Sequence, residues 1–195
     1  MIIKRKFYNN DTVKIAKDLL GCFLVRKYRG KIIKAMITET EAYRGHYDLA
    51  SHASRGKTER NKIMFGKAGK AYIYLVYGMH YMLNIVTEEK DFPAAVLIRG
   101  AKLLGHPMSK CKMTSDVLVL DGPAKLTKYL HINKSLNGHN LTKGEKLWIE
   151  KRHPMSKGKK TSDVSHFEII KSPRIGVDYA KHCKNWKWNF KAVLC

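Results

Sequence analysis

The chain has 195 residues, of which 44% are apolar, so its composition provides one hydrophobic core and excludes a wholly disordered protein. No stretch reaches the roughly 18–20 uncharged apolar residues of a membrane span, and the basic N-terminus lacks the apolar segment of a signal peptide. With 38 Lys plus Arg against 16 Asp plus Glu, the net charge of +22 predicts a polyanionic partner, with nucleic acid as the first candidate. The alternative is a lysine-rich proteome, in which this charge carries no functional information.

The N-terminal third predicts a helix, two strands and a long loop. Asp11 suits a helix N-cap, and apolar residues then recur at helical spacing until Gly21. Residues 22–28 and 31–43 have the composition of two consecutive strands. Residues 44–69 are polar and irregular, and a loop of this length is typical of a functional segment.

The rest of the chain predicts mainly strands. Residues 71–77 and 81–86 flank Gly78-Met79-His80 and predict a β-hairpin. We further expect strands at 94–104, 145–150 and 167–171 and a short helix at 123–130. This mixture predicts an α+β fold with a mainly antiparallel sheet, in a single domain that spans residues 1–195.

Two other sequence features bear on function. A lysine-rich motif (HPMSK followed by TSDV) occurs at 106–117 and again at 153–164. The two copies are too few and too short for a solenoid, and they predict either loops that touch phosphates or solvated loops without a function. None of Cys22, Cys111, Cys183 and Cys195 lies in a C-x-x-C pair, which indicates free thiols in a reducing compartment.

Two carboxylates stand close together near the end of the second predicted strand. Strand alternation places Glu39, Glu41 and Tyr43 on one face. A buried carboxylate here could act as a general base that activates water. The pair could instead hold Mg²⁺, as in a metal-dependent nuclease, or it could be a solvated strand end that pairs with lysines.

The predicted hairpin is rich in tyrosine. Alternation places Tyr72 and Tyr74 on one face and sends Tyr77 to the other, at the tip. Tyrosine rings stack on bases, and an aromatic side chain at a hairpin tip can wedge into a base stack. Tyrosine also favours strands and packs sheet faces, which suffices for Tyr72 and Tyr81 but not for Tyr77 beside a turn.

Eight segments along the chain form an ordered set whose pieces are individually weak. In order and spacing, the set resembles the signature of the alkyladenine (3-methyladenine) DNA glycosylases, the mammalian-type methylpurine DNA glycosylases. The segments are Glu39-Thr40-Glu41-Ala42-Tyr43, Ser51-His52, Arg60-Asn61, Met64-Phe65-Gly66, Tyr77-Gly78-Met79-His80, Arg99, Gly122-Pro123-Ala124-Lys125-Leu126 and Pro173-Arg174-Ile175-Gly176-Val177.

The resemblance implies one compact domain with a curved sheet and a protruding β-hairpin that enters the DNA minor groove. The enzyme would flip a damaged purine out of the duplex and hydrolyse its N-glycosidic bond without a metal or organic cofactor. By this resemblance, Glu41 would activate the attacking water with help from Arg99. The damaged base would lie in a pocket in which Tyr43, His52 and Tyr74 sandwich it and Asn84 rejects normal guanine. On the DNA, Tyr77 would fill the gap in the duplex, and Met79 and His80 would lie near the backbone.

The hairpin allows a geometric prediction. A two-residue turn at Gly78-Met79 would place Tyr74 and Asn84 on opposite faces, whereas a three-residue loop, 78–80, would pair them on one face. Because Tyr74 and Asn84 are both expected to line one pocket, we predict a loop with an odd number of residues, or a bulge, with positive φ at Gly78.

The expected partner is double-stranded DNA that contains alkylated or deaminated purines, such as 3-methyladenine, 7-methylguanine, hypoxanthine or ethenoadenine. We expect a monomer with no membrane attachment, in the cytoplasm and nucleoid of a prokaryote or in the nucleus of a eukaryote. The main alternative is a non-catalytic basic nucleic-acid-binding protein, for which the charge and the tyrosines would suffice.

Overall fold

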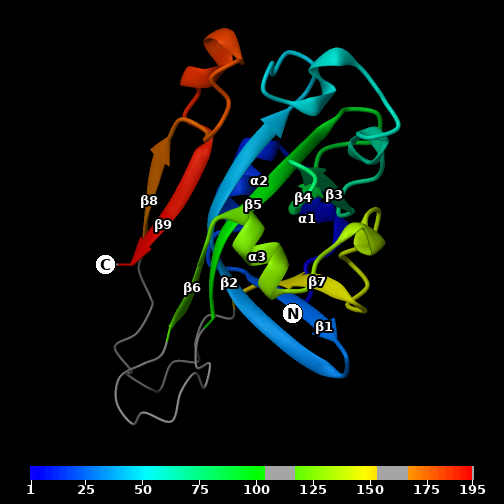
Figure 1. Ribbon diagram of the computed structural model, residues 1–195, viewed down its shortest axis with the longest axis vertical. Coiled ribbons are helices and arrows are strands. Elements are labelled where there is room, and N and C mark those ends of the chain that lie inside the picture. Colours follow the sequence, from blue (N-terminus) through cyan, green and yellow to red (C-terminus); the bar gives the residue numbers. More distant parts are fainter. Residues whose placement is uncertain (104–116, 153–166, 195) are drawn as a thin grey trace.

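The strands of the protein assemble into one antiparallel sheet. The computed structural model describes residues 1–103, 117–152 and 167–194. In the main path of the sheet the strands follow the order β3-β4-β5-β2-β1-β7, while β6 pairs with β5, β9 with β2 and β8 with β9 (Figure 1). The strands are β1 Phe23–Tyr28, β2 Lys31–Arg44, β3 Ala71–Val76, β4 His80–Val86, β5 Ala94–Leu103, β6 Leu118–Asp121, β7 Leu147–Glu150, β8 Phe167–Ser172 and β9 Asn189–Leu194.

The long strand β2 organises this sheet. Its first half pairs with β1 and its second half with β9, while β5 runs along its other edge. The register between β2 and β5 shifts on both sides of Glu39, which marks a β-bulge there. Every residue from 35 to 42 is buried, so the second half of β2 is covered on both faces. Charged side chains in this stretch therefore require buried partners.

Short helices pack against the sheet. Asp11 caps α2 by accepting a hydrogen bond from the Lys14 amide at 2.8 Å, as predicted. The Thr40 hydroxyl donates to the Ala16 carbonyl at 2.7 Å, which ties α2 to β2, and α3 contacts β4, β5 and β6. The α-helices are α1 Arg5–Tyr8, α2 Thr12–Asp18 and α3 Pro123–Tyr129, and the 3₁₀ helices are η1 His52–Arg55, η2 Lys62–Phe65, η3 Lys134–Leu136 and η4 Lys181–Asn185.

The predicted α+β fold with a mainly antiparallel sheet is confirmed, and the sheet curls into a half-barrel. The sequence patterns missed α1, β6 and β9. Both lysine-rich copies lie outside the described residues except for Val117. Within the described part of the chain, Cys22 and Cys183 are buried free thiols, and the helices there are too short or too polar to cross a membrane.

The β3–β4 hairpin has a three-residue loop, as predicted, but its strand pairing is shifted from the predicted register. Val76 pairs with His80, so the loop is 77–79 and not 78–80, and the predicted pairing of Tyr74 with Asn84 is wrong. Tyr74 pairs with Met82 and Tyr72 pairs with Asn84, which still places Tyr74 and Asn84 on one face. Gly78 has φ +71° as predicted, and Tyr77 also has positive φ, +51°. Because two successive residues adopt this conformation, the turn closes one residue earlier than predicted.

Candidate active site

Segments far apart in the sequence meet around a cavity of about 310 Å³. The hairpin strands β3 and β4 form part of its wall, together with β2, β5, the start of α3, the 44–69 loop and the segment after β8. All four predicted base-pocket residues line it, as do Tyr77 and Arg99, although Met79, His80 and Glu41 do not. The predicted residues in its lining are Tyr43, His52, Tyr74, Asn84, Tyr77 and Arg99, and further members are Arg60, Tyr72, Met82, Leu97, Ile175 and Tyr179.

One wall of the cavity is an aromatic cluster. The rings of His52 and Tyr74 meet edge to face with centroids 4.5 Å apart, and His52 Nδ1 lies 2.9 Å from the Tyr72 hydroxyl. Burial, with a smaller effect from the charge of Arg60, lowers the pKa of His52 to about 4. Burial also raises the pKa of Tyr74 to about 12. At neutral pH this wall is therefore uncharged at both His52 and Tyr74.

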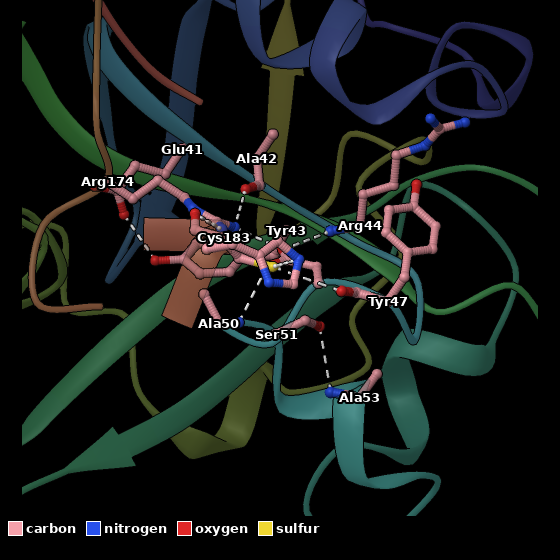
Figure 2. Close-up of polar contacts among 12 residues, drawn as sticks. Glu41, Ala42, Tyr43, Arg44, Tyr47, Ala50, Ser51, Ala53, Arg174 and Cys183 are labelled. Atoms are coloured by element: carbon pink, nitrogen blue, oxygen red, sulfur yellow. Dashed lines mark hydrogen bonds and ion pairs between the residues drawn. The ribbon is translucent and has the colours of Figure 1, made fainter. Parts of the chain in front are cut away.

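Tyr43 is held in place by buried charges (Figure 2). Its hydroxyl donates to Glu41 Oε2 at 2.8 Å, and the Arg174 guanidinium carbon lies 4.8 Å from the ring centroid. Asp48 binds Arg174 through two contacts of 2.6 and 2.8 Å, and both side chains are fully buried. Burial, followed by the Glu41 charge, raises the pKa of Tyr43 well above its usual value. The Tyr43 ring therefore presents a fixed, neutral surface to the cavity.

Asn84 is fixed by the hairpin backbone. Its amide nitrogen donates to the Tyr72 carbonyl at 3.2 Å and to the Met82 carbonyl at 3.4 Å. The side chain is buried, with 3% of its surface exposed. A polar group held this firmly on the wall of a cavity can discriminate between ligands by shape and hydrogen bonding.

Glu41 lies behind the cavity wall and is fully buried. Its Oε1 accepts from the Ile175 amide at 2.8 Å and from Asn189 Nδ2 at 3.1 Å, and Arg99 Nε is 3.6 Å away. Together with Tyr43 on Oε2, these donors stabilise a buried carboxylate. Tyr43, Arg99 and Ile175 each also line the cavity, so Glu41 is one side chain removed from it.

Protein groups occupy the space between Glu39 and Glu41. Asn189 Nδ2 bridges the two carboxylates, and Arg99 Nε contacts both. The described ranges contain no group of three or more His, Cys, Asp and Glu side chains suited to a metal ion. A guanidinium thus takes the place between the carboxylates that the nuclease hypothesis assigned to Mg²⁺.

The hairpin tip projects into solvent. Tyr77 is 87% exposed and Met79 is 69% exposed, and His80 is exposed as well. Tyr77 follows Val76, the last residue of β3, so strand alternation does not determine its side, and it belongs to the lining of the cavity. A large exposed aromatic side chain in a left-handed conformation is typical of a functional site.

Several residues of the site were not predicted in these positions. The segment Pro173–Val177 belongs to the motif set, but nothing in the sequence predicts that its Ile175 amide binds Glu41. Asp48, the partner of Arg174, gave no signal within the irregular loop. Asn189 lies 148 residues from Glu41 in the sequence and was not singled out.

Comparisons with known proteins agree on one family. Residues 6–193 match the family described as methylpurine-DNA glycosylase (MPG). A protein of Carboxydothermus hydrogenoformans is 44% identical over 184 residues, which cover 93% of this chain and 91% of that protein. A Clostridium perfringens protein is 39% identical over 202 residues, which cover 97% and 95% of the two chains. Both relatives are named "Putative 3-methyladenine DNA glycosylase".

Proposed function

The chain belongs to the methylpurine-DNA glycosylase family and is a DNA glycosylase, a hydrolase of DNA repair, and from that premise we propose how it acts. It flips an alkylated or deaminated purine out of duplex DNA into the cavity and hydrolyses the N-glycosidic bond with a water that Glu41 activates. The observation that carries this proposal is the Glu41 carboxylate, which three hydrogen-bond donors and the Arg99 ion pair hold beside an aromatic-lined cavity of about 310 Å³. Flipping is necessary because the stacked duplex hides the bond to be cleaved.

The aromatic wall suits a cationic base. Alkylation at N3 or N7 places a positive charge on the purine, and such a base is attracted to the faces of Tyr43 and Tyr74. His52 would repel a cation if it were protonated, but its pKa of about 4 keeps it neutral at physiological pH. Asn84 would reject normal guanine by crowding its exocyclic amine. The substrate class is therefore alkylated purines first, with hypoxanthine and ethenoadenine as neutral candidates.

The reaction consumes one water and needs no redox step. Water adds to the anomeric carbon of the sugar, the bond to the base nitrogen breaks, and that bonding pair returns to the base. An alkylated cationic purine then leaves as a neutral molecule, while the water loses its proton to Glu41. The sugar passes through a state with oxocarbenium character, which the nearby negative charge stabilises. Arg99, which lines the cavity, helps to hold the water.

The exposed hairpin tip suits the DNA duplex. Tyr77 would fill the gap that the flipped nucleotide leaves, and Met79 and His80 would lie near the backbone. The net charge of +22 supplies the attraction to phosphates. Because one flipped base requires one site, we propose a monomer, and the bacterial relatives suggest that it acts on DNA in a prokaryotic nucleoid.

Release of free base from methylated DNA tests this function. Purified protein is incubated in EDTA with duplex DNA treated with a methylating agent, and the freed bases are identified by chromatography. We expect release of 3-methyladenine without strand breaks, and its collapse in Glu41→Gln while DNA binding survives. The exposed β8 carboxylate offers a matched control, Glu168→Gln, which should keep wild-type activity. Tight binding without any release by the wild-type protein would favour the non-catalytic binding protein.

A further inference from the structure

Glu39, the second carboxylate beside the site, contacts the same two donors as Glu41. Arg99 Nε lies 3.1 Å from Glu39 Oε1 but 3.6 Å from Glu41 Oε1. Asn189 Nδ2 lies 2.9 Å from Glu39 Oε1 and 3.1 Å from Glu41 Oε1. Glu39 therefore has the shorter contact with each donor.

The charges of this cluster do not cancel. Two carboxylates face one guanidinium, and Asn189 is neutral, so the cluster carries a net charge of about −1 when both acids are ionised. If Arg99 paired with Glu41 alone, the pair would be neutral and less able to stabilise a developing positive charge. Because Glu39 has the closer contact with Arg99, it balances the guanidinium and leaves the charge of Glu41 available.

Other charged side chains share a second cavity with Glu39. Glu39 is only 7% exposed, yet it lines a second cavity, of about 390 Å³, that Lys102, Lys191 and Asp121 also line. A buried carboxylate requires such compensation from cations and hydrogen-bond donors. Arg99 lines the first cavity and Glu39 the second, so their contact joins the walls of the two.

The backbone around Glu39 is shaped to hold it there. The β-bulge at Glu39 shifts the register with β5, which places Glu39 opposite Gly100. A Cβ at Gly100 would lie 3.2 Å from the Glu39 Cβ, closer than most side chains pack, so the glycine leaves room for the β2 backbone to carry the Glu39 side chain at this point. The arrangement thus depends on two local departures from a regular strand pair.

We propose that Glu39 is a positioning residue, which balances the charge of Arg99 and holds Arg99 and Asn189 so that the Glu41 carboxylate keeps its negative charge for the attacking water and the sugar. This inference rests on the function proposed above for Glu41. Without the Glu39 carboxylate, Arg99 would pair fully with Glu41 and withdraw from the cavity. The loss would affect the chemical step and not the binding of DNA.

A double-mutant cycle tests this role. The rate of 7-methylguanine release from methylated duplex DNA is measured under single-turnover conditions for wild type, Glu39→Gln, Arg99→Gln and the double variant. We expect Glu39→Gln to lower the rate about tenfold in the wild-type background and less than about twofold in the Arg99→Gln background, because the cation it balances is then missing. The affinity for DNA with an abasic-site analogue should stay within about threefold of wild type, and Glu168→Gln controls for the change in net charge.

The outcomes separate this inference from the proposed function. A wild-type protein that releases no base refutes the proposed function. A wild-type protein that releases base, with Glu39→Gln equally fast or with equal losses in both backgrounds, refutes the role of Glu39. If Glu39→Gln fails to bind DNA because it does not fold, Glu39→Asp decides, since it keeps the charge but shortens the reach to Arg99. That variant should release base more slowly and bind normally, and wild-type rates in it would overturn the inference.

Discussion

The neutral His52 predicts a specific loss of stability in mild acid. Its pKa is about 4 in the folded protein, first because of burial and then because of Arg60, against about 6.5 in an unfolded chain. Between these values the unfolded chain binds a proton that the folded chain does not, so stability falls as the pH falls below about 6.5. From pH 7 to pH 5 the two pKa values give a loss of about 2 kcal/mol, an upper value because the partly exposed ring is screened by solvent.

Urea unfolding at pH 7 and at pH 5 measures this loss. Other groups also titrate in this range, so the wild type is compared with His52→Asn, which lacks the imidazole. The free energy of unfolding should fall by up to about 2 kcal/mol more in the wild type than in this variant. His80→Asn, which changes an exposed histidine, serves as the control and should behave as the wild type. Equal pH dependence in wild type and His52→Asn would refute the reasoning, because His52 would then take up its proton as easily in the folded state.

Two further substitutions separate binding from stability. Tyr77→Ala should weaken the complex with abasic-analogue DNA, measured by fluorescence anisotropy, more than single lysine substitutions do, and unchanged affinity would contradict its role at the tip. Because Tyr77 is 87% exposed, the same substitution should change the free energy of unfolding by less than about 0.5 kcal/mol. Asp48→Asn leaves the buried Arg174 charge without its partner and should lower the free energy of unfolding in urea by about 3–5 kcal/mol. A loss below about 1 kcal/mol would show that the Asp48–Arg174 ion pair does not hold the buried structure behind Tyr43.

Local patterns determined most of the fold. The α2 helix follows from its Asp11 cap and apolar spacing, and the hairpin follows from two apolar strands around a glycine turn. These signals succeed because helix caps and tight turns depend on residues that are neighbours in the sequence. The short strands β6 and β9 were missed because segments of four to six residues carry little periodicity.

Only the tertiary structure decided how the site is assembled. The hairpin register depended on a left-handed Tyr77, which local propensity disfavours. The motif residues around the cavity could be named from the sequence, but not the burial of Glu41 behind the wall or the partners that hold it. Asn189 reaches Glu39 from 150 residues away because β9 pairs with β2, and such a contact leaves no trace in local spacing. The sequence by itself therefore named most of the candidate residues that meet at the cavity, whereas long-range strand pairing decided which carboxylate Arg99 holds more closely.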